Sequence, residues 1–133
     1  MEIKDVRPAF SSTRGLTLIE IMVVVAIIGL VMGGVGVVAF QRFKKAQVET
    51  SKTEIRSLKA AIQHWSVDNP GEGCPKALLE LYSQKYISKA PRDPWNQDFV
   101  YNCPGTGEDG FDIVSKGPDK QPNTEDDIKS AGL

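Results

Sequence analysis

The sequence predicts an α+β fold: a long N-terminal helix, membrane-spanning in its first half, packed on a small antiparallel sheet with an acidic C-terminal loop. The first observation behind this is a 25-residue run from Leu16 to Phe40 that contains one charge, Glu20. The second is a stripe of apolar residues at helical spacing between residues 55 and 65. The third is a pair of short, strand-like segments near the C-terminus, separated by glycine and proline.

The apolar run is predicted to stay in the membrane. As a helix it is about 37 Å long, enough to cross the hydrocarbon layer. It is longer than the apolar region of a signal peptide, and no A-x-A cleavage site follows it. We therefore divide the chain into a leader over residues 1–15, a transmembrane and assembly helix over 16–40, and a globular domain over 41–133.

Glu20 is the informative residue of the run. A carboxylate five positions into an apolar helix costs free energy, so a partner or a function is expected for it. The alternative is that Glu20 lies at the membrane interface and reaches water, because it is close to the helix end.

The helix is predicted to continue beyond the membrane to about Val67. Asp68-Asn69-Pro70-Gly71 then stops it. Trp65 is expected at the edge of the core and His64 on the surface. The stripe that faces the core comprises Ile55, Leu58, Ile62 and Trp65, widened by Val48 and Ala61.

A small sheet domain follows. A short helix is expected to start at Pro75 and to turn Leu78, Leu79, Leu81 and Tyr82 toward the long helix. Asp93-Pro94-Trp95-Asn96 signals a turn. Phe99–Tyr101 and Phe111–Val114 are predicted strands, joined by a hairpin connection through residues 104–110.

Charge and cysteine usage limit the possible functions. The net charge of −1 does not suit a general nucleic-acid binder. Cys74 and Cys103 show no CxxC spacing, and the single histidine leaves no zinc or haem motif. A disulfide in an oxidising compartment is the simplest use of the pair, and two unrelated buried thiols are the alternative. No catalytic pair, nucleophile motif or cofactor box is present, so an enzyme is not expected.

Gly15-Leu16-Thr17-Leu18-Ile19-Glu20 resembles the prepilin processing motif of type IV pilins and pseudopilins. The resemblance implies that a prepilin peptidase cuts between Gly15 and Leu16 and methylates the new N-terminus at Leu16, where the family usually has Phe. It also implies a role for Glu20, which would neutralise the α-amino group of a neighbouring subunit during assembly, since a buried charge is tolerable only when paired.

The segments DPWNQDFVY, FDIVSKGPD and EDDI are similar to the C-terminal half of major pseudopilins, with Asn96 in place of the family's glycine. This implies a homopolymer: a periplasmic pseudopilus that drives protein export by a type II secretion system. Its implied partners are an inner-membrane assembly platform, minor pseudopilins and, before assembly, membrane lipid. The alternative is a true type IV pilus for adhesion, motility or DNA uptake, in which a disulfide usually encloses the C-terminal loop.

In the same family the acidic C-terminal loop binds calcium. The matching positions are Asp119, Asp126 and Asp127, with the backbone of Val114 and Ser115 nearby. Oxygen-rich loops of this kind suit Ca²⁺, which prefers six to eight oxygen ligands. The alternative is a solvated acidic loop.

The charges that flank the apolar run favour a different membrane topology from the one that the leader motif implies. Three Lys or Arg precede it and six follow between Gln41 and His64, so the positive-inside rule would place the globular domain in the cytoplasm. The leader motif, the expected disulfide and the calcium loop all require the periplasm. We therefore predict a single-pass inner-membrane protein with a periplasmic domain, which later enters the filament.

Overall fold

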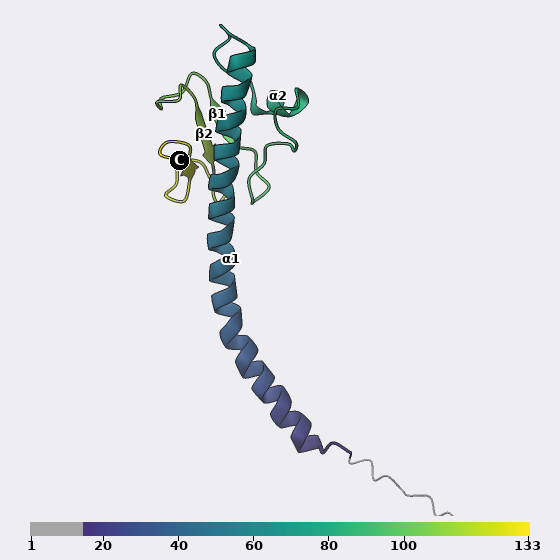
Figure 1. Ribbon diagram of the computed structural model, residues 1–133. Coiled ribbons are helices and arrows are strands. Elements are labelled where there is room, and N and C mark those ends of the chain that lie inside the picture. The colour runs from purple at the N-terminus through teal and green to yellow at the C-terminus, as the bar shows by residue number, and fades with distance from the viewer. Residues whose placement is uncertain (1–14) are drawn as a thin grey trace, which may run out of the picture. The chain divides into compact units, whose positions relative to one another are not determined.

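The computed structural model describes residues 15–133 (Figure 1), so leader residues 1–14 lie outside the described part. The described chain contains two helices and three strands. It falls into two compact units that meet between Ala39 and Phe40, and the first helix, α1 (Leu18–Asp68), contributes to both.

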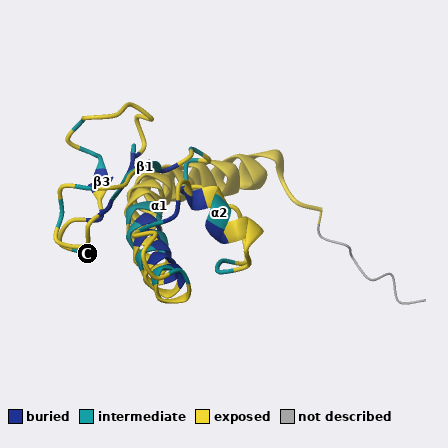
Figure 2. Cartoon of the chain, turned by 90° about the horizontal axis from the view of Figure 1, so that it is seen from above, coloured by how far each residue is buried: buried dark blue, intermediate teal, exposed yellow. Residues whose placement is uncertain are grey.

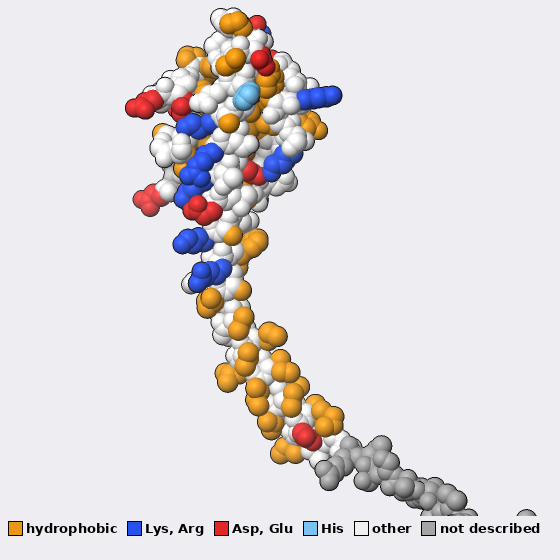
Figure 3. All heavy atoms as spheres, viewed as in Figure 1, with side chains coloured by type: hydrophobic (Ala, Val, Ile, Leu, Met, Phe, Trp, Pro, Cys, Tyr) orange, Lys and Arg blue, Asp and Glu red, His pale blue; other side chains and the backbone are white. Residues whose placement is uncertain are grey.

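The first unit is the apolar half of α1. Within the described residues, α1 is the one helix long and apolar enough to cross a membrane. Its apolar side chains are exposed all around the helix, as with Leu30 at 81% and Leu18 at 79%. Figure 3 shows hydrophobic side chains along the visible face of this half of the helix. An all-round apolar helix is typical of a membrane span or of a helix buried by other chains.

The second unit is built on the other half of α1. Its buried residues recur every three or four positions, which places them on one face (Figure 2): Ser51, Ile55, Leu58, Ala61, Ile62 and Trp65. This confirms the predicted stripe. Trp65 differs from expectation, because at 2% exposed it lies inside the core rather than at its edge. Its indole Nε1 donates to Gln84 Oε1 at 3.1 Å, which satisfies the polar end of the ring.

The second helix, α2 (Leu78–Ser83), is short as predicted but starts at Leu78 rather than at Pro75. Leu78 and Leu81 are buried in the core, three residues apart on one face. Leu79 and Tyr82 were expected to face the long helix, and this was wrong, since they are 60% and 45% exposed. A helix of six residues has less than two turns and presents only one i, i+3 pair to the core.

The sheet is antiparallel with strand order β1-β2-β3. The strands are β1 (Val100–Asn102), β2 (Asp112–Ser115) and β3 (Ile128–Lys129). The hairpin pairs Val100 with Val114, so the two predicted strands are confirmed, each displaced by one residue. The third strand was not predicted. It pairs Ile128 with Ser115 and closes the acidic loop against the sheet.

Two apolar residues beside the strands complete the core. Phe99 and Phe111 precede β1 and β2 and are 8% and 5% exposed, and Ile113 within β2 is fully buried. They pack with the buried face of α1 and with α2 in one hydrophobic cluster. The core therefore joins the helix to all three strands and holds the loops at the sheet ends in place.

Candidate functional site

The residues of the processing motif open the described chain. Gly15 and Leu16 are exposed, and nothing lies within 4 Å of the position that a Cβ on Gly15 would take. The Gly15–Leu16 peptide bond is therefore free of tertiary contacts among the described residues. α1 starts two residues later, at Leu18, because Thr17 caps it.

Thr17 and Glu20 form a reciprocal cap at the start of α1. The Glu20 amide donates to Thr17 Oγ1 at 3.3 Å, and the Thr17 amide donates to Glu20 Oε2 at 3.4 Å. This is a capping box, which satisfies two of the free N–H groups at a helix start. This role of Thr17 was not predicted, although the T-x-x-E spacing signals it. The cap holds the Glu20 carboxylate against the amide of Thr17, the residue that follows Leu16.

The two cysteines are joined. Cys74, in the loop before α2, bonds to Cys103, just after β1, with their Cα atoms 6.6 Å apart. This confirms the expected disulfide. The bridge encloses residues 74–103, which contain α2 and the turn at Asp93. The acidic loop after β2 lies outside it, unlike the arrangement expected for a pilus subunit.

The acidic loop runs from Lys116 to Asp127, between β2 and β3. Hydrogen bonds bring its end back to its start, since the Asp119 amide donates to Asp126 Oδ2 at 3.2 Å. Thr124 Oγ1 donates to Asp126 Oδ1 at 2.7 Å and lies 3.3 Å from Asp127 Oδ1. The Thr124 hydroxyl, together with the Asp119 amide, holds the pKa of Asp126 below its ordinary value. Two carboxylates thus lie around one hydroxyl.

The predicted calcium ligands are brought together only in part. Asp126 and Asp127 share Thr124, whereas Asp119 Oδ1 accepts from the Gln121 amide at 2.8 Å. Ser115 ends β2, and Val114 lies within it between β1 and β3. Across residues 15–133, no three His, Cys, Asp or Glu side chains are gathered as a metal cage. The donor atoms are all oxygen, which fits a hard cation, and the loop's own N–H and O–H groups occupy several of them.

The Asp112 carboxylate orders the hairpin connection between β1 and β2. Asp112 accepts from the Thr106 amide at 2.8 Å, the Thr106 hydroxyl at 3.0 Å and the Gly107 amide at 3.2 Å. The Thr106 amide contributes most to lowering the pKa of Asp112. This side chain therefore fixes the loop between β1 and β2 and needs no metal to do so.

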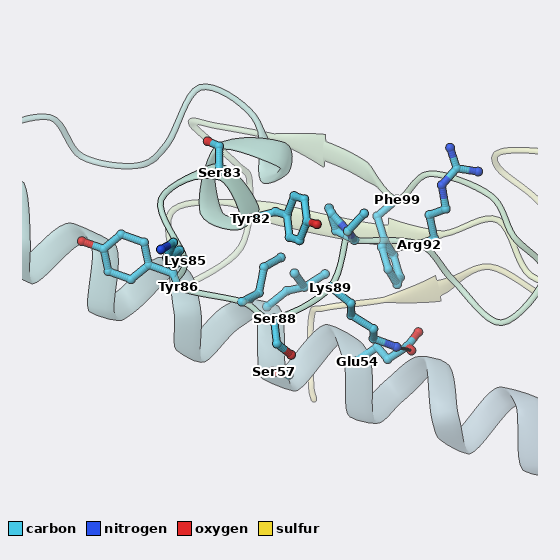
Figure 4. A pocket seen from close by; sticks show the side chains of 14 residues that line it. Glu54, Ser57, Tyr82, Ser83, Lys85, Tyr86, Ser88, Lys89, Arg92 and Phe99 are labelled. Carbon is cyan, nitrogen blue, oxygen red and sulfur yellow. Dashed lines mark hydrogen bonds and ion pairs between the residues drawn. The ribbon is translucent and has the colours of Figure 1, made fainter.

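A groove lies between α1 and the segment that follows α2 (Figure 4). Its volume is about 870 Å³, and Leu58, Tyr82 and Phe99 are among its lining residues. Lys89, in the segment after α2, forms an ion pair with Glu54 on α1. Glu54 is the one acidic residue among those that line it, and no histidine or cysteine takes part. The groove brings no nucleophile and base together and is best described as a surface between α1 and this segment.

The basic residues of α1 lie in the second unit, from its start onward along the helix (Figure 3). Lys44 lies 4.7 Å from the centre of the Phe40 ring, and Lys52 pairs with Glu49 at 2.9 Å. Lys59 is used differently, because it contacts Asp109 at 2.7 Å and the Leu133 carbonyl at 3.0 Å. Lys59 thus ties the helix to the hairpin connection and to the end of the sheet domain.

A capped, exposed apolar helix that carries a small sheet with an acidic loop defines a pilin-like subunit, and comparison with known proteins specifies which kind. The family described as type II secretion system (T2SS), protein G matches residues 38–131, and the prokaryotic N-terminal methylation motif matches residues 10–36. The chain belongs to the type II secretion system protein G family.

Individual relatives agree. The type II secretion system core protein G of Escherichia coli K12 is 32% identical, with 94% of this chain and 95% of the relative covered. That of Pectobacterium carotovorum is 35% identical, with 90% and 85% covered. The crystal structure of the major pseudopilin from the type 2 secretion system of enterohaemorrhagic E. coli superposes with a TM-score of 0.53 at 28% identity, covering 71% of this chain and 94% of that one.

Proposed function

We propose that this chain is a structural subunit, not an enzyme, which polymerises through its N-terminal helix into a periplasmic pseudopilus that drives protein export. The observation that carries the proposal is the exposed apolar half of α1. Side chains such as Val31, at 55%, and Met32, at 67%, are left uncovered by the other residues of the described part, 15–133. Such a surface is not stable in water, so lipid or other subunits must cover it.

Lipid covers this apolar surface before assembly, and other subunits cover it afterwards. Before assembly the helix spans the inner membrane, with the globular unit in the periplasm and the basic residues near Arg42 beside anionic headgroups. After assembly the same helices pack against each other in the filament core. The disulfide supports the periplasmic placement, because such bonds persist in oxidising compartments. The implied partners are the prepilin peptidase, the inner-membrane platform and the minor pseudopilins.

Cleavage of the leader produces a free α-amino group on Leu16, which can pair with Glu20 of a neighbouring subunit. The new α-amino group of Leu16 is positive and becomes buried when helices stack, where an unpaired charge is costly. Glu20 is the one carboxylate in the apolar run, and the Thr17 cap keeps it at the helix start. A neighbour's amine can therefore pair with it and set the axial register of each incoming subunit.

We expect Glu20→Ala to insert and be cleaved normally but to form at most a few per cent of wild-type filaments. Two further variants separate charge from capping. Glu20→Gln keeps a hydrogen-bonding side chain without the charge, and Thr17→Ala removes the cap but keeps the charge. The measurement is the mass of sheared filaments relative to membrane-held subunit for each variant. Wild-type assembly of Glu20→Gln, with failure of Thr17→Ala, would show that Glu20 acts only as a cap.

Calcium is the proposed ligand of the acidic loop. Asp119, Asp126 and Asp127 would hold it, with backbone oxygens at Val114 and Ser115, and the ion would offset the mutual repulsion of the carboxylates. The all-oxygen donor set and the proximity of Asp126 to Asp127 support this. The internal hydrogen bonds of the loop favour the alternative of a loop that holds itself without an ion.

Thermal unfolding of the full chain in detergent decides between them. An ion that binds only the folded form adds RT ln(1 + [L]/Kd), about 2.7 kcal/mol at a hundredfold excess over Kd. We expect calcium to raise the midpoint above that in chelator for wild type and for Asp98→Ala, an exposed carboxylate outside the loop. Asp119→Ala should lose the rise. Equal midpoints in calcium and chelator for wild type would mean that the loop is only solvated.

A further inference from the structure

The turn that precedes β1 contains a buried carboxylate that no function described so far uses. Asp93 is 5% exposed, yet no cation pairs with it among residues 15–133. Its Oδ1 accepts from the Gln97 amide at 2.8 Å and from the Trp95 amide at 3.1 Å. Burial of a charge is costly unless hydrogen bonds replace water, and these two bonds satisfy only one of its oxygens.

The other carboxylate oxygen of Asp93 is hydrogen-bonded to a residue outside the turn. Oδ2 accepts from the hydroxyl of Ser115, the last residue of β2, at 2.8 Å. Ser115 is fully buried, and its Oγ in turn accepts from the Gly117 amide at 3.3 Å. A continuous hydrogen-bonded path therefore runs from the turn, through the end of the central strand, to the start of the acidic loop.

Gly117 is where this path meets the acidic loop. It has φ +66°, and a Cβ there would collide with the Asp126 carbonyl oxygen and lie 2.9 Å from Asp126 Oδ2. The backbone of Gly117 is thus packed directly on Asp126. Because the Asp119 amide donates to the same Oδ2, the position of Gly117 helps to set where both acidic residues lie.

We propose that Asp93 and Ser115 are positioning residues for the acidic loop: they hold Gly117 against Asp126 and thereby set the loop's affinity for calcium. The second half of this statement rests on the calcium binding proposed above. The Asp93 carboxylate is suited to the role, because one of its oxygens accepts from the amides of the turn while the other accepts from Ser115. Ser115 is suited because its single oxygen both donates to Asp93 and accepts from Gly117.

Ser115→Ala removes the link, and Ser130→Ala is the matched control. Ser130 is also a buried serine beside the same strand, 3% exposed, and its Oγ accepts from the Ile113 amide at 3.0 Å. Both variants lose one buried serine hydroxyl bonded to a backbone amide, but only Ser115 leads to the loop. Ser115→Ala also removes the donor to Asp93 Oδ2, so the loss of protection at the loop is compared with the loss at amides outside the loop in each variant.

The first measurement needs no metal. Hydrogen exchange of the full chain in detergent and chelator should show at least tenfold lower protection of the Gly117 amide in Ser115→Ala than in Ser130→Ala. In the second measurement, calorimetric titration with calcium alone, Ser115→Ala should bind about tenfold more weakly than wild type, as expected for one lost hydrogen bond. Ser130→Ala should bind within twofold of wild type.

A second variant keeps the proposal testable if Ser115→Ala folds poorly. Asp93→Asn preserves shape and can still accept from the Gln97 and Trp95 amides, but its NH2 group replaces the oxygen that accepts from Ser115. It should reproduce the loss of Gly117 protection, whereas Asp98→Asn, whose side chain is 81% exposed, should not.

Equal Gly117 protection in the test and control variants would overturn the positioning role. An equal change of calcium affinity in both serine variants would overturn the link to the ion. If wild type binds no calcium, the calcium assignment fails and the exchange measurement alone decides the positioning role.

Discussion

Replacing Gly15 by valine is expected to leave essentially all of the chain uncut and held in the membrane as precursor. Cleavage requires the peptidase to approach the backbone at Gly15, and a β-branched side chain blocks that approach. The substitution does not disturb the described fold, because no atom lies within 4 Å of the new Cβ and the position is exposed. Any loss of filaments therefore reflects processing, read as the ratio of precursor to mature mass in membrane extracts.

Leu16→Phe is the matched control for this variant. It changes the other side of the same bond to the residue that the family usually carries, so it should be cut as efficiently as wild type. Efficient cleavage of Gly15→Val would place the processing site elsewhere in the chain.

Removing the disulfide is expected to cost the globular unit about 3–4 kcal/mol of unfolding free energy, from the chain-entropy value for a loop of this length. The bridge spans 29 residues that contain α2 and the turn at Asp93. Its loss should therefore loosen the contact between Tyr101 and the Pro75 carbonyl, now a hydrogen bond of 2.9 Å. Urea unfolding of the Cys74→Ser, Cys103→Ser double variant measures the effect.

Reduced wild-type protein is the control for the disulfide variant. Reduction should produce the same loss as the double substitution, and alkylation of native protein should label neither cysteine until a reductant is added. Two thiols that react in freshly isolated protein, or an unchanged stability in the double variant, would show that the bond does not hold the fold together.

The elements of this fold that could be predicted are those with long, periodic signals. The apolar run and the stripe from Ile55 to Trp65 span many turns, so a single helix follows directly from them. The left-handed conformation of Asn96, with φ 61°, could also be expected, because the turn requires a residue that tolerates it.

Short elements and tertiary hydrogen bonds could not be predicted in the same way. β3 has two residues and no periodicity, and it forms only because β2 offers a free edge. Tyr82 was assigned to the core from its hydrophobicity alone, whereas the short helix turns it outward. The bond between Asp93 and Ser115 joins residues 22 positions apart, and only the packed sheet brings them together.

The central claim, that the chain is cut at Gly15 and polymerises through its N-terminal helix, is tested most directly by the intact mass of subunits from sheared wild-type filaments. We expect one dominant mass, that of residues Leu16–Leu133 with a methylated amine and one disulfide. Filaments whose subunits retain residues Met1–Gly15 would contradict it, as would a methylated, mature chain that never leaves the membrane when the secretion machinery is present.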